Sequence, residues 1–458
     1  MSLPKYGKYK DSGVSWLENV PAHWRVLRLK YACRVFPSNV DKHFRDDEPS
    51  VQLCNYTDVY YNEQITADMP FMKASASADQ VAKFTLKAGD TIITKDSETA
   101  DDIAIAAYVP EDLPGVVCGY HLSMIRPYPG TSGAFVKRLF DSIYAKARFA
   151  VAANGLTRVG LGQYALDNVE LPFPPIDEQI AIAAFLDRET AKIDALIAEQ
   201  EKLIALVAEK RQAAISHSVT NGINPNAPMK DSGVAWLGEV PAHWEVGALK
   251  RYWSVTDCKH ITAEFVDDGY PLASIREVQS RYVLLDAAKR TTRLYYEQLI
   301  EGGRQPSPGD LIFSRNATVG EVAQVEKCHP PFAMGQDVCL LRRLCDDSSS
   351  DFMQFVIRSS VVVEQLKNIM VGSTFKRVNV EEIRGLQVPA PPPEEQARIA
   401  AFLIEECDTL DMLKREAELA ISLLRERRSA LIAAAVIGQL DVREAVAHAV
   451  EAQEAIAA

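Results

Sequence analysis

Residues 10–24 read KDSGVSWLENVPAHW, and residues 230–244 read KDSGVAWLGEVPAHW. Twelve of these fifteen positions are identical, at an offset of 220 residues. Self-similarity of this kind in a chain of 458 residues indicates two copies of one structural unit. The chain is therefore expected to carry out one task twice.

A second pair of matching stretches closes each copy. Residues 171–186 read LPFPPIDEQIAIAAFL and residues 388–403 read VPAPPPEEQARIAAFL, at an offset of 217. Weaker echoes link residues 89–93 to 309–313 and residues 119–126 to 335–342. Most of the sequence between these matches differs. A duplicated frame around different fillings predicts one scaffold that carries two different recognition surfaces.

Composition excludes several classes of protein. No run approaches 18 apolar residues, so no membrane span is expected, and the start MSLPKYGKYKDSG lacks the apolar region of a signal peptide. The eight cysteines form no Cys-x-x-Cys pair and none lies at a duplicated position, which favours reduced thiols over disulfides or a metal site. These features predict a soluble cytoplasmic protein without a bound metal.

The net charge of −12 is unusual for a nucleic-acid-binding protein. However, this negative charge is not evenly distributed along the chain. Residues 1–175 carry 19 basic and 20 acidic side chains, and residues 223–393 carry 19 and 21. The excess of acids is concentrated in residues 176–222 (5 basic, 8 acidic) and 394–458 (7 basic, 13 acidic). Residues 1–175 and 223–393 are nearly neutral in net charge, so strong binding to DNA phosphates is expected to need a partner protein.

Five segments are predicted along the chain. Residues 1–175 and 223–393 mix short β-type runs with Gly, Pro and Asp turns, and each ends in a proline cluster that cannot be helix interior. Residues 176–222 and 394–440 each predict one long helix. Residues 441–458 form an acidic, Ala-rich tail. The expected fold class is α+β, with two similar globular α/β domains in a pseudo-two-fold arrangement, separated by a pair of long antiparallel helices.

The long helices carry the apolar spacing of a coiled coil. Ile193, Ile197, Gln200, Ile204 and Val207 follow a 4-3-4-3 pattern in the first helix. In the second helix an apolar residue recurs every seven positions from Leu403 to Leu431. A helix of roughly 60 Å would expose such a stripe if it stood alone. Pairing of the two helices is favoured over separate helix bundles or homodimerisation through the same seam.

The candidate binding residues lie where the two copies diverge. Gly-rich loops that bear Thr, Lys and Arg can approach a phosphate backbone, and Arg and Asn can read base edges. The candidates for DNA binding are Lys95, Thr157, Arg158, Arg315, Asn316, Thr374, Lys376 and Arg377. For each one, an ordinary surface loop is an equally acceptable interpretation. The duplicated box with Trp24 and Trp244 is nearly identical in both copies, so it is interpreted as a structural clasp.

Catalytic motifs are missing from the sequence. It has no Gly-x-x-x-x-Gly-Lys-Ser/Thr loop for ATP and no Gly-x-Gly-x-x-Gly after a strand. Residues 224–228 (NPNAP) lack the aromatic of an amino-methyltransferase Asn-Pro-Pro-Tyr site. The expectation is a protein with no enzymatic activity and no cofactor of its own.

The order of these motifs resembles the specificity subunits of type I restriction-modification enzymes. The resemblance rests on VPAHW before each variable domain and on the PxPPxxEQxxIAxFL-like start of each long helix, and it spans residues 10 to about 440. It implies that each variable segment is a target recognition domain that reads one half of an asymmetric, bipartite sequence in double-stranded DNA. It also implies that the two helices form an antiparallel coiled coil that sets the half-site spacing.

The same resemblance implies partners. Two methyltransferase subunits would dock on the chain, and restriction subunits would join through the complex. S-adenosylmethionine, ATP and magnesium would belong to those partners. Two other readings compete with this one, namely a self-sufficient DNA-modifying enzyme and a coiled-coil scaffold that binds only proteins.

Overall fold

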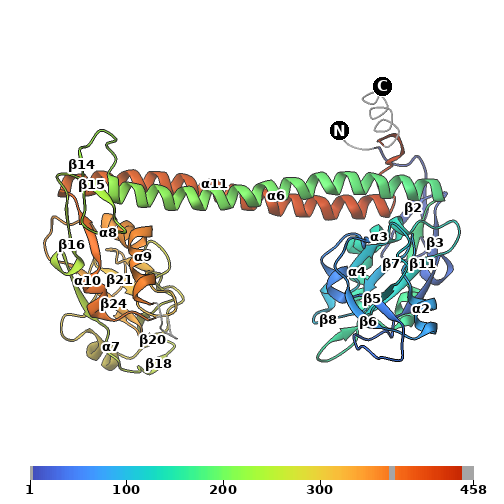
Figure 1. The fold of residues 1–458 in the computed structure, drawn as a ribbon, viewed down its shortest axis with the longest axis horizontal. Coiled ribbons are helices and arrows are strands. Elements are labelled where there is room, and N and C mark those ends of the chain that lie inside the picture. The colour runs from blue at the N-terminus through green and yellow to red at the C-terminus, as the bar shows by residue number, and fades with distance from the viewer. Residues whose placement is uncertain (1–3, 371–376, 446–458) are drawn as a thin grey trace. The chain divides into compact units, whose positions relative to one another are not determined.

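The computed structural model describes residues 4–370 and 377–445 and divides the chain into two compact units. Unit 1 comprises residues 1–200 and 419–458, and unit 2 comprises residues 201–418. Helices α6 (Ile176–Asn221) and α11 (Pro393–Val436) each contribute one end to each unit (Figure 1). Two mixed α/β domains joined by long helices confirm the predicted fold class.

Unit 1 is built from short strands and helices that precede α6. Its strands are β1 (Tyr9–Asp11), β2 (Asn19–Pro21), β3 (Arg25–Arg28), β4 (Cys33–Pro37), β5 (Ser50–Cys54), β6 (Met72–Ser75), β7 (Thr91–Thr94), β8 (Asp96–Ser97), β9 (Ala106–Tyr108), β10 (Val116–Cys118), β11 (Leu122–Pro127), β12 (Val159–Gly160) and β13 (Glu170–Phe173). Its helices are η1 (Leu29–Tyr31), α1 (Tyr56–Tyr60), α2 (Ala78–Phe84), η2 (Ala100–Asp102), α3 (Gly133–Asp141), α4 (Ile143–Ala152) and α5 (Gln163–Asn168).

Unit 2 repeats this order with a different middle. Its strands are β14 (Met229–Asp231), β15 (Glu239–Pro241), β16 (Glu245–Ala248), β17 (Trp253–Asp257), β18 (Phe265–Val266), β19 (Tyr270–Ala273), β20 (Arg290–Thr291), β21 (Leu311–Ser314), β22 (Val322–Gln324), β23 (Ala333–Met334), β24 (Val338–Arg343) and β25 (Gln387–Ala390). Its helices are η3 (Leu249–Arg251), α7 (Arg293–Ile300), α8 (Ser350–Arg358), α9 (Ser360–Ile369) and α10 (Val380–Gly385).

Both units contain the same antiparallel four-stranded sheet. Its strand order is β4-β11-β7-β9 in unit 1 and β17-β24-β21-β22 in unit 2. Beside it, each unit has one parallel strand pair, β5 with β10 and β19 with β23. The strands that extend this pair differ, because β5 continues to β6 whereas β19 continues to β20 and β18. The shared sheet is the duplicated frame, and the extensions belong to the different fillings.

Weak echoes in the sequence correspond to one ion pair in each sheet. Asp90, immediately before β7, accepts hydrogen bonds from Arg126 of β11, and their closest atoms, Asp90 Oδ2 and Arg126 Nη2, are 2.6 Å apart. In unit 2 Asp310 holds Arg342 in the same way at 2.7 Å. The hydrogen bond to the carboxylate raises the pKa of each arginine. Paired arginines of this type fix adjacent strand ends in register.

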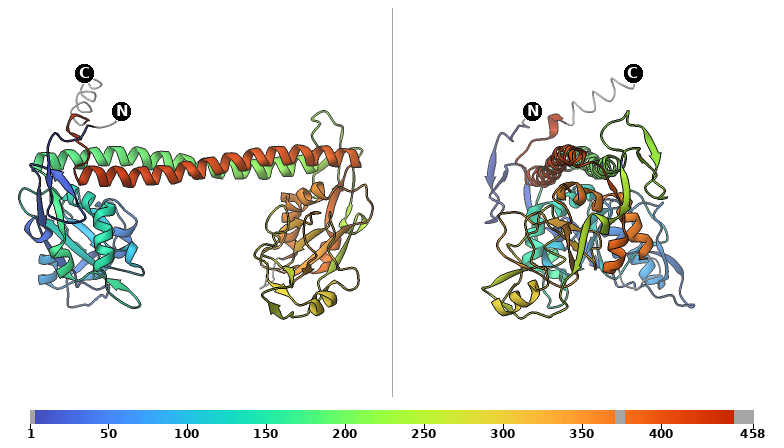
Figure 2. Two further views of the ribbon diagram at one scale, coloured as in Figure 1. Left: turned by 180° about the vertical axis from the view of Figure 1, so that it is seen from behind. Right: turned by 90° about the vertical axis from the view of Figure 1, so that its left-hand side faces the viewer.

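The two long helices run antiparallel within each unit. In unit 1 Arg428 of α11 pairs with Asp194 of α6, with Nε and Oδ1 2.9 Å apart. In unit 2 Lys210 of α6 pairs with Glu406 of α11, with Nζ and Oε1 2.8 Å apart. Figure 2 shows the helices side by side in each unit. Of the predicted seam, Ile193, Val207, Leu403, Leu410 and Ala417 are buried.

The duplicated box clasps the first turn of each long helix. Trp24 is fully buried, and its Nε1 donates to Glu178 Oε1 of α6 at 3.0 Å. Trp244 is equally buried and donates to Glu395 Oε2 of α11 at 3.1 Å. These contacts confirm the clasp interpretation and explain why the box and the Pro-Pro-x-x-Glu-Gln start are duplicated together.

The glutamine of the same motif contacts the N-terminus of a domain helix, α3 in unit 1 and α8 in unit 2. Gln179 Oε1 accepts from the backbone N–H of Ser132, the N-cap residue of α3, and Gln396 Oε1 accepts from Ser349, the N-cap residue of α8. Each amide also donates to a proline carbonyl of the preceding strand exit. The Glu-Gln pair thus attaches both the box and a domain helix to each long helix.

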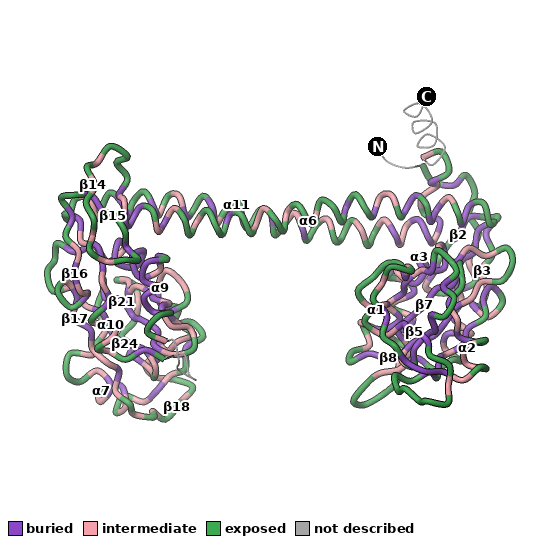
Figure 3. The backbone as a smooth tube through the Cα atoms, in the orientation of Figure 1, coloured by how far each residue is buried: buried purple, intermediate pink, exposed green. Residues whose placement is uncertain are grey.

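Buried residues in each unit extend from the sheet into the adjoining helix ends (Figure 3). In unit 1 the main core joins Trp24 and Phe135 to Ile182 of α6 and Ile432 of α11. In unit 2 it joins Trp244 and Phe352 to Ile215 and Leu403. Across the residues that the structure describes, none of the helices combines the length and apolar character that a membrane span requires.

Candidate nucleic-acid interface

In unit 1 the fold brings together two candidate loops that lie far apart in the sequence. Strand β12 pairs with β8, with Gly160 opposite Asp96 and Val159 opposite Ser97. This register places the loop with Thr157 and Arg158 beside Lys95. Arg158 Nη2 lies 3.4 Å from Asp96 Oδ1, and both Thr157 and Arg158 are exposed.

Unit 2 joins the corresponding segments. An isolated antiparallel bridge links Asn316, which follows β21, to Arg377. Arg377 is exposed, and its Nη2 lies 3.8 Å from Asp337 Oδ1. Asn316 is half-buried, and its side-chain oxygen accepts from the backbone N–H of Ala317. Thr374 and Lys376 lie outside the described residues.

The two basic candidates that directly follow a central strand point inward. Lys95 Nζ donates to the carbonyl of Ser38 at 3.1 Å and lies over the ring of Tyr120, and burial lowers the pKa of its ammonium group. Arg315 is only 3% exposed, and its Nη2 lies 2.7 Å from Asp257 Oδ1 at the end of β17.

These placements alter the interpretation of both residues. Each one links the end of the central strand to the strand end or loop beside it. The expectation that Arg315 lies on a surface open to DNA does not agree with this structure, because its charge is already neutralised in the interior. Lys95 is half-buried and committed to the same kind of contact. Both side chains are committed to contacts within their own unit, and the candidates that lie exposed among the described residues are Thr157, Arg158 and Arg377.

A cavity opens at the same topological position in both units, at the ends of the parallel strand pair. In unit 1 it has a volume of about 230 Å³ and is lined by Lys42, His43, Asn55, Tyr56, Tyr120 and His121. In unit 2 it has a volume of about 470 Å³, and its lining includes Thr262, Phe265, Arg276, Lys289, Gln336 and Asp337. The frame therefore repeats one cavity while the chemistry of its lining differs.

One duplicated glycine explains why the cavity lies there. Gly119 follows β10, and its N–H donates to the carbonyl of Cys54 at the end of β5. A Cβ at Gly119 would lie 2.7 Å from that carbonyl oxygen. Gly335 makes the equivalent bond to Ala273, and a Cβ there would lie 2.1 Å from Ser274 Oγ. At Gly119 the clash is with backbone, so only glycine allows the two strand ends to approach so closely, whereas at Gly335 the clash is with a side chain. These close approaches set the floor of each cavity.

In unit 1 the cavity and the candidate loop form one surface. His121, which lines the cavity, contacts Asp96 through Nδ1 at 2.8 Å, and Asp96 also pairs with Arg158. Neither His121 nor Asp96 is among the site residues predicted from the sequence. The echo that begins at Gly119 marks this segment, but it gives no sign that the segment meets the loop before β12.

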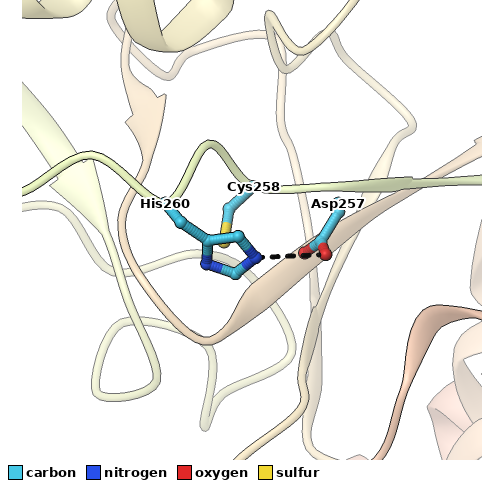
Figure 4. Close-up of side chains that lie close together, drawn as sticks. All are labelled: Asp257, Cys258 and His260. Atoms are coloured by element: carbon cyan, nitrogen blue, oxygen red, sulfur yellow. Dashed lines mark ion pairs between the residues drawn. The ribbon is translucent and has the colours of Figure 1, made fainter.

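Two groups of potential metal ligands occur among the described residues. Asp257, Cys258 and His260 offer ligand atoms within 4.8 Å of one another, and Figure 4 shows His260 directed at the Asp257 carboxylate. That carboxylate already pairs with Arg315, and burial raises the pKa of the Cys258 thiol. Since metals bind the thiolate, these features favour an ion-paired strand end over a metal site.

The second group, Glu326, Cys328 and His329, lies within one surface loop. The His329 Nδ1 accepts from the backbone N–H of Glu326 at 3.1 Å. This contact leaves the proton of the neutral ring on Nε2, the atom that faces the Glu326 carboxylate at 3.9 Å. Since Nδ1 already accepts a backbone hydrogen bond and Nε2 faces the carboxylate, a histidine–glutamate contact accounts for the group.

Comparisons with known proteins agree with this arrangement. The family model "Type I restriction modification DNA specificity domain" matches residues 50–205 and 288–419. Similar curated proteins include the putative type I restriction enzyme MjaX specificity subunit of Methanocaldococcus jannaschii, at 21% identity over 90% of this chain and 93% of that protein. The EcoKI specificity subunit of Escherichia coli is 20% identical over 71% of this chain and 68% of its own length.

Solved structures show the same fold. The HsdS subunit from Thermoanaerobacter tengcongensis matches with a TM-score of 0.54 at 18% identity, over 92% of this chain and 98% of that one. A chain from a structural study of complex assembly and conformational transition in the type I R-M system matches with a TM-score of 0.64, also at 18% identity, over 92% and 99%.

Proposed function

The chain belongs to the family of type I restriction modification DNA specificity domains, and we propose that it is the DNA-recognition subunit of a type I restriction-modification complex. In this proposal each unit reads one half of an asymmetric, bipartite target in double-stranded DNA. The observation that carries the proposal is the duplicated cavity, which has one position in the frame and two different linings.

The linings supply chemistry suited to base edges. In unit 1 His43, Asn55 and His121 offer both donors and acceptors, and in unit 2 Arg276 and Gln336 offer a guanidinium and an amide. Arginine pairs with guanine and Gln or Asn pairs with adenine in the major groove. Different donor and acceptor sets in the two units lead to different half-sites, hence to an asymmetric target.

Affinity for phosphate in this proposal depends on partners. Residues 1–175 and 223–393, which contain the two cavities, are close to neutral in net charge, so this chain alone neutralises few DNA phosphates. Methyl transfer and ATP-dependent cleavage are assigned to methyltransferase and restriction subunits of a cytoplasmic complex, together with their S-adenosylmethionine, ATP and magnesium. The specificity subunit itself contributes recognition and no catalysis.

Two equivalent patches support docking of two methyltransferase subunits. Leu196 and Leu423 are exposed on the long helices of unit 1, and Leu413 and Leu206 are exposed at the corresponding positions of unit 2, offset by 217 residues. Single exposed apolar residues are common on protein surfaces, but the recurrence of both leucines at equivalent positions supports one docking surface in each unit. Because each unit carries one leucine from α6 and one from α11, each unit offers the same patch to one copy of the partner.

Docking can be tested one patch at a time. The pair Leu196→Arg and Leu423→Arg should reduce the complex by one methyltransferase subunit in native mass spectrometry, as should Leu413→Arg with Leu206→Arg. The four changes together should leave the chain without that partner. A more exposed apolar residue elsewhere, Ile143 of α4, provides the control substitution Ile143→Arg. An intact complex of all three subunits in the fourfold variant would refute the assignment.

The recognition proposal is tested by co-expression with the neighbouring methyltransferase subunit, followed by mapping of methylated adenines across the host genome by long-read sequencing. A single two-part asymmetric motif with a fixed spacer is expected. An intact complex that adds no methylation would contradict the proposal and favour a protein-binding scaffold.

The same assay tests the division of labour between the units. Replacing residues 1–175 with the equivalent region of a relative should change one half of the motif only. Deleting one heptad from each helix, residues 193–199 with 410–416, should change the spacer and leave both half-sites intact. A change in both halves after the first replacement, or in either half after the deletion, would refute independent units on a helical ruler.

A further inference from the structure

A short loop in unit 1 presents an exposed apolar tip. The loop runs between α4 and β12 and is closed by two reciprocal backbone hydrogen bonds between Asn154 and Gly160, at 3.1 and 2.9 Å. Leu156 stands at the tip and is the most exposed large apolar residue among those that the structure describes. Thr157 and Arg158 follow it and are exposed as well.

The backbone of this loop is held in one shape. Gly155 has a φ of +149°, and a Cβ at this position would lie 1.9 Å from the carbonyl oxygen of Arg158. Only glycine fits, so the turn before Leu156 is built for close approach of the chain to itself. Strand β12, which ends the loop, is in turn paired with β8. Leu156 is therefore presented by a fixed loop and not by a loose one.

The loop is also joined to the cavity of unit 1. Asp96 of β8 contacts His121 of the cavity wall and Arg158 of the loop. Arg158 is half exposed and 3.4 Å from Asp96, and exposed pairs of this kind contribute little stability. The guanidinium can exchange Asp96 for a phosphate at small cost.

We infer that Leu156 is a wedge that inserts between base pairs of the half-site read by unit 1, while Thr157 and Arg158 contact the flanking backbone. This inference rests on the proposed function. Proteins that kink DNA insert an apolar side chain at a base step, and basic residues beside it hold the phosphates. A rigid, fully exposed leucine flanked by a hydroxyl and a guanidinium meets these requirements.

Such a wedge would add specificity without a base-edge hydrogen bond. Unstacking costs least at pyrimidine–purine steps, so the half-site of unit 1 should contain one such step at the position of Leu156. Sequence preference at that step would reflect how easily the DNA deforms.

The test uses the full chain in complex with its methyltransferase subunits and duplexes that carry the mapped motif. 2-Aminopurine is placed at successive positions of the unit 1 half-site, apart from the methylated base, which methyltransferases extrude on their own. The wild-type complex should raise the fluorescence at one step. Leu156→Ala should abolish that rise and weaken binding about tenfold, equivalent to ~1.4 kcal/mol.

Two further variants separate a wedge from general damage. Leu156→Met keeps a long apolar side chain and should retain the fluorescence signal. Val151→Ala trims another exposed apolar residue near the end of α4 and should change nothing. No unstacked step in the wild-type complex, or an unchanged signal in Leu156→Ala, would overturn this inference and leave the proposed function standing. Absence of any methylated motif would overturn both.

Discussion

Removal of the clasp carboxylate should destabilise the two units unequally. Among the described residues, Glu178 accepts hydrogen bonds from Tyr6, Trp24 and His23, whereas Glu395 accepts them from Trp244 and His243 alone. Both histidines are close to half exposed and can turn to water. Glu178→Ala therefore leaves two buried donors without a partner, and Glu395→Ala leaves one.

The count of buried donors sets the magnitude. An unsatisfied buried donor costs about 1–3 kcal/mol, so Glu178→Ala should cost ~4 kcal/mol and Glu395→Ala ~2 kcal/mol. Loss of the acid from the first helical turn adds about the same small amount to each. Trp24 and Tyr6 are 0% and 5% exposed, so water does not replace the lost acceptor.

The effect of a second substitution, Tyr6→Phe, on the stability of unit 1 should change sign when Glu178 is removed. Tyr6→Phe alone should destabilise unit 1, because it removes a donor to Glu178. In the Glu178→Ala background it should stabilise unit 1 by ~2 kcal/mol, because it removes an unsatisfied hydroxyl.

Amide hydrogen exchange, read by mass spectrometry on peptides around Trp24 and Trp244, reports the opening of each clasp separately. A cost of ~4 kcal/mol corresponds to exchange faster by roughly a thousandfold, and ~2 kcal/mol to roughly thirtyfold. Equal acceleration in Glu178→Ala and Glu395→Ala would refute the donor count. A destabilising effect of Tyr6→Phe in both backgrounds would refute the role assigned to the hydroxyl.

Two further predictions concern the cavity floor and a buried lysine. Gly119→Ala places its Cβ against the backbone carbonyl of Cys54 and should lower stability by ~2 kcal/mol in thermal denaturation, whereas Gly335→Ala meets the side chain of Ser274 and should be rescued by Ser274→Ala. A larger loss in Gly335→Ala than in Gly119→Ala would contradict this. Burial lowers the pKa of Lys137 from 10.5 to about 8. Between these values the unfolded chain holds a proton that the folded unit has released, so Lys137 contributes a stability that rises with pH across this window, whereas the buried thiols with raised pKa contribute a fall. Urea denaturation should therefore show that the difference in stability between the wild type and Lys137→Met changes in favour of the wild type as the pH rises, and a difference that does not depend on pH would exclude this contribution.

Much of the architecture could be predicted because the sequence contains two copies of the same motifs. The heptads of the long helices and the repeated box each have a period or an offset that a single sequence displays. Burial of Ile193, Leu403 and Trp24 follows from these patterns, since an apolar stripe and an indole both need a covering surface. The echo at Gly89 and Asp90 likewise corresponds to the paired arginine of each sheet.

The candidate site could be predicted only in part. The loops at Lys95 and Arg158 were identified as separate segments, and the β8–β12 pairing that joins them spans more than sixty residues with no repeated spacing. Arg315 was interpreted as an exposed cation because an arginine after a strand gives no sign of a carboxylate across the sheet. Asp257 lies there, half-buried, and its partner Arg315 is buried.

The sequence by itself determined the duplication, the pairing partners of the long helices and the positions at which the two copies diverge. These are local or periodic properties, and they can be recognised in the sequence because each residue's neighbours along the chain determine them. Only the tertiary structure decided which basic side chains face inward, where the cavity opens and which leucine remains uncovered. Those outcomes depend on which strand ends approach each other, as at Gly119 and Cys54, and that approach is fixed by packing across the whole unit.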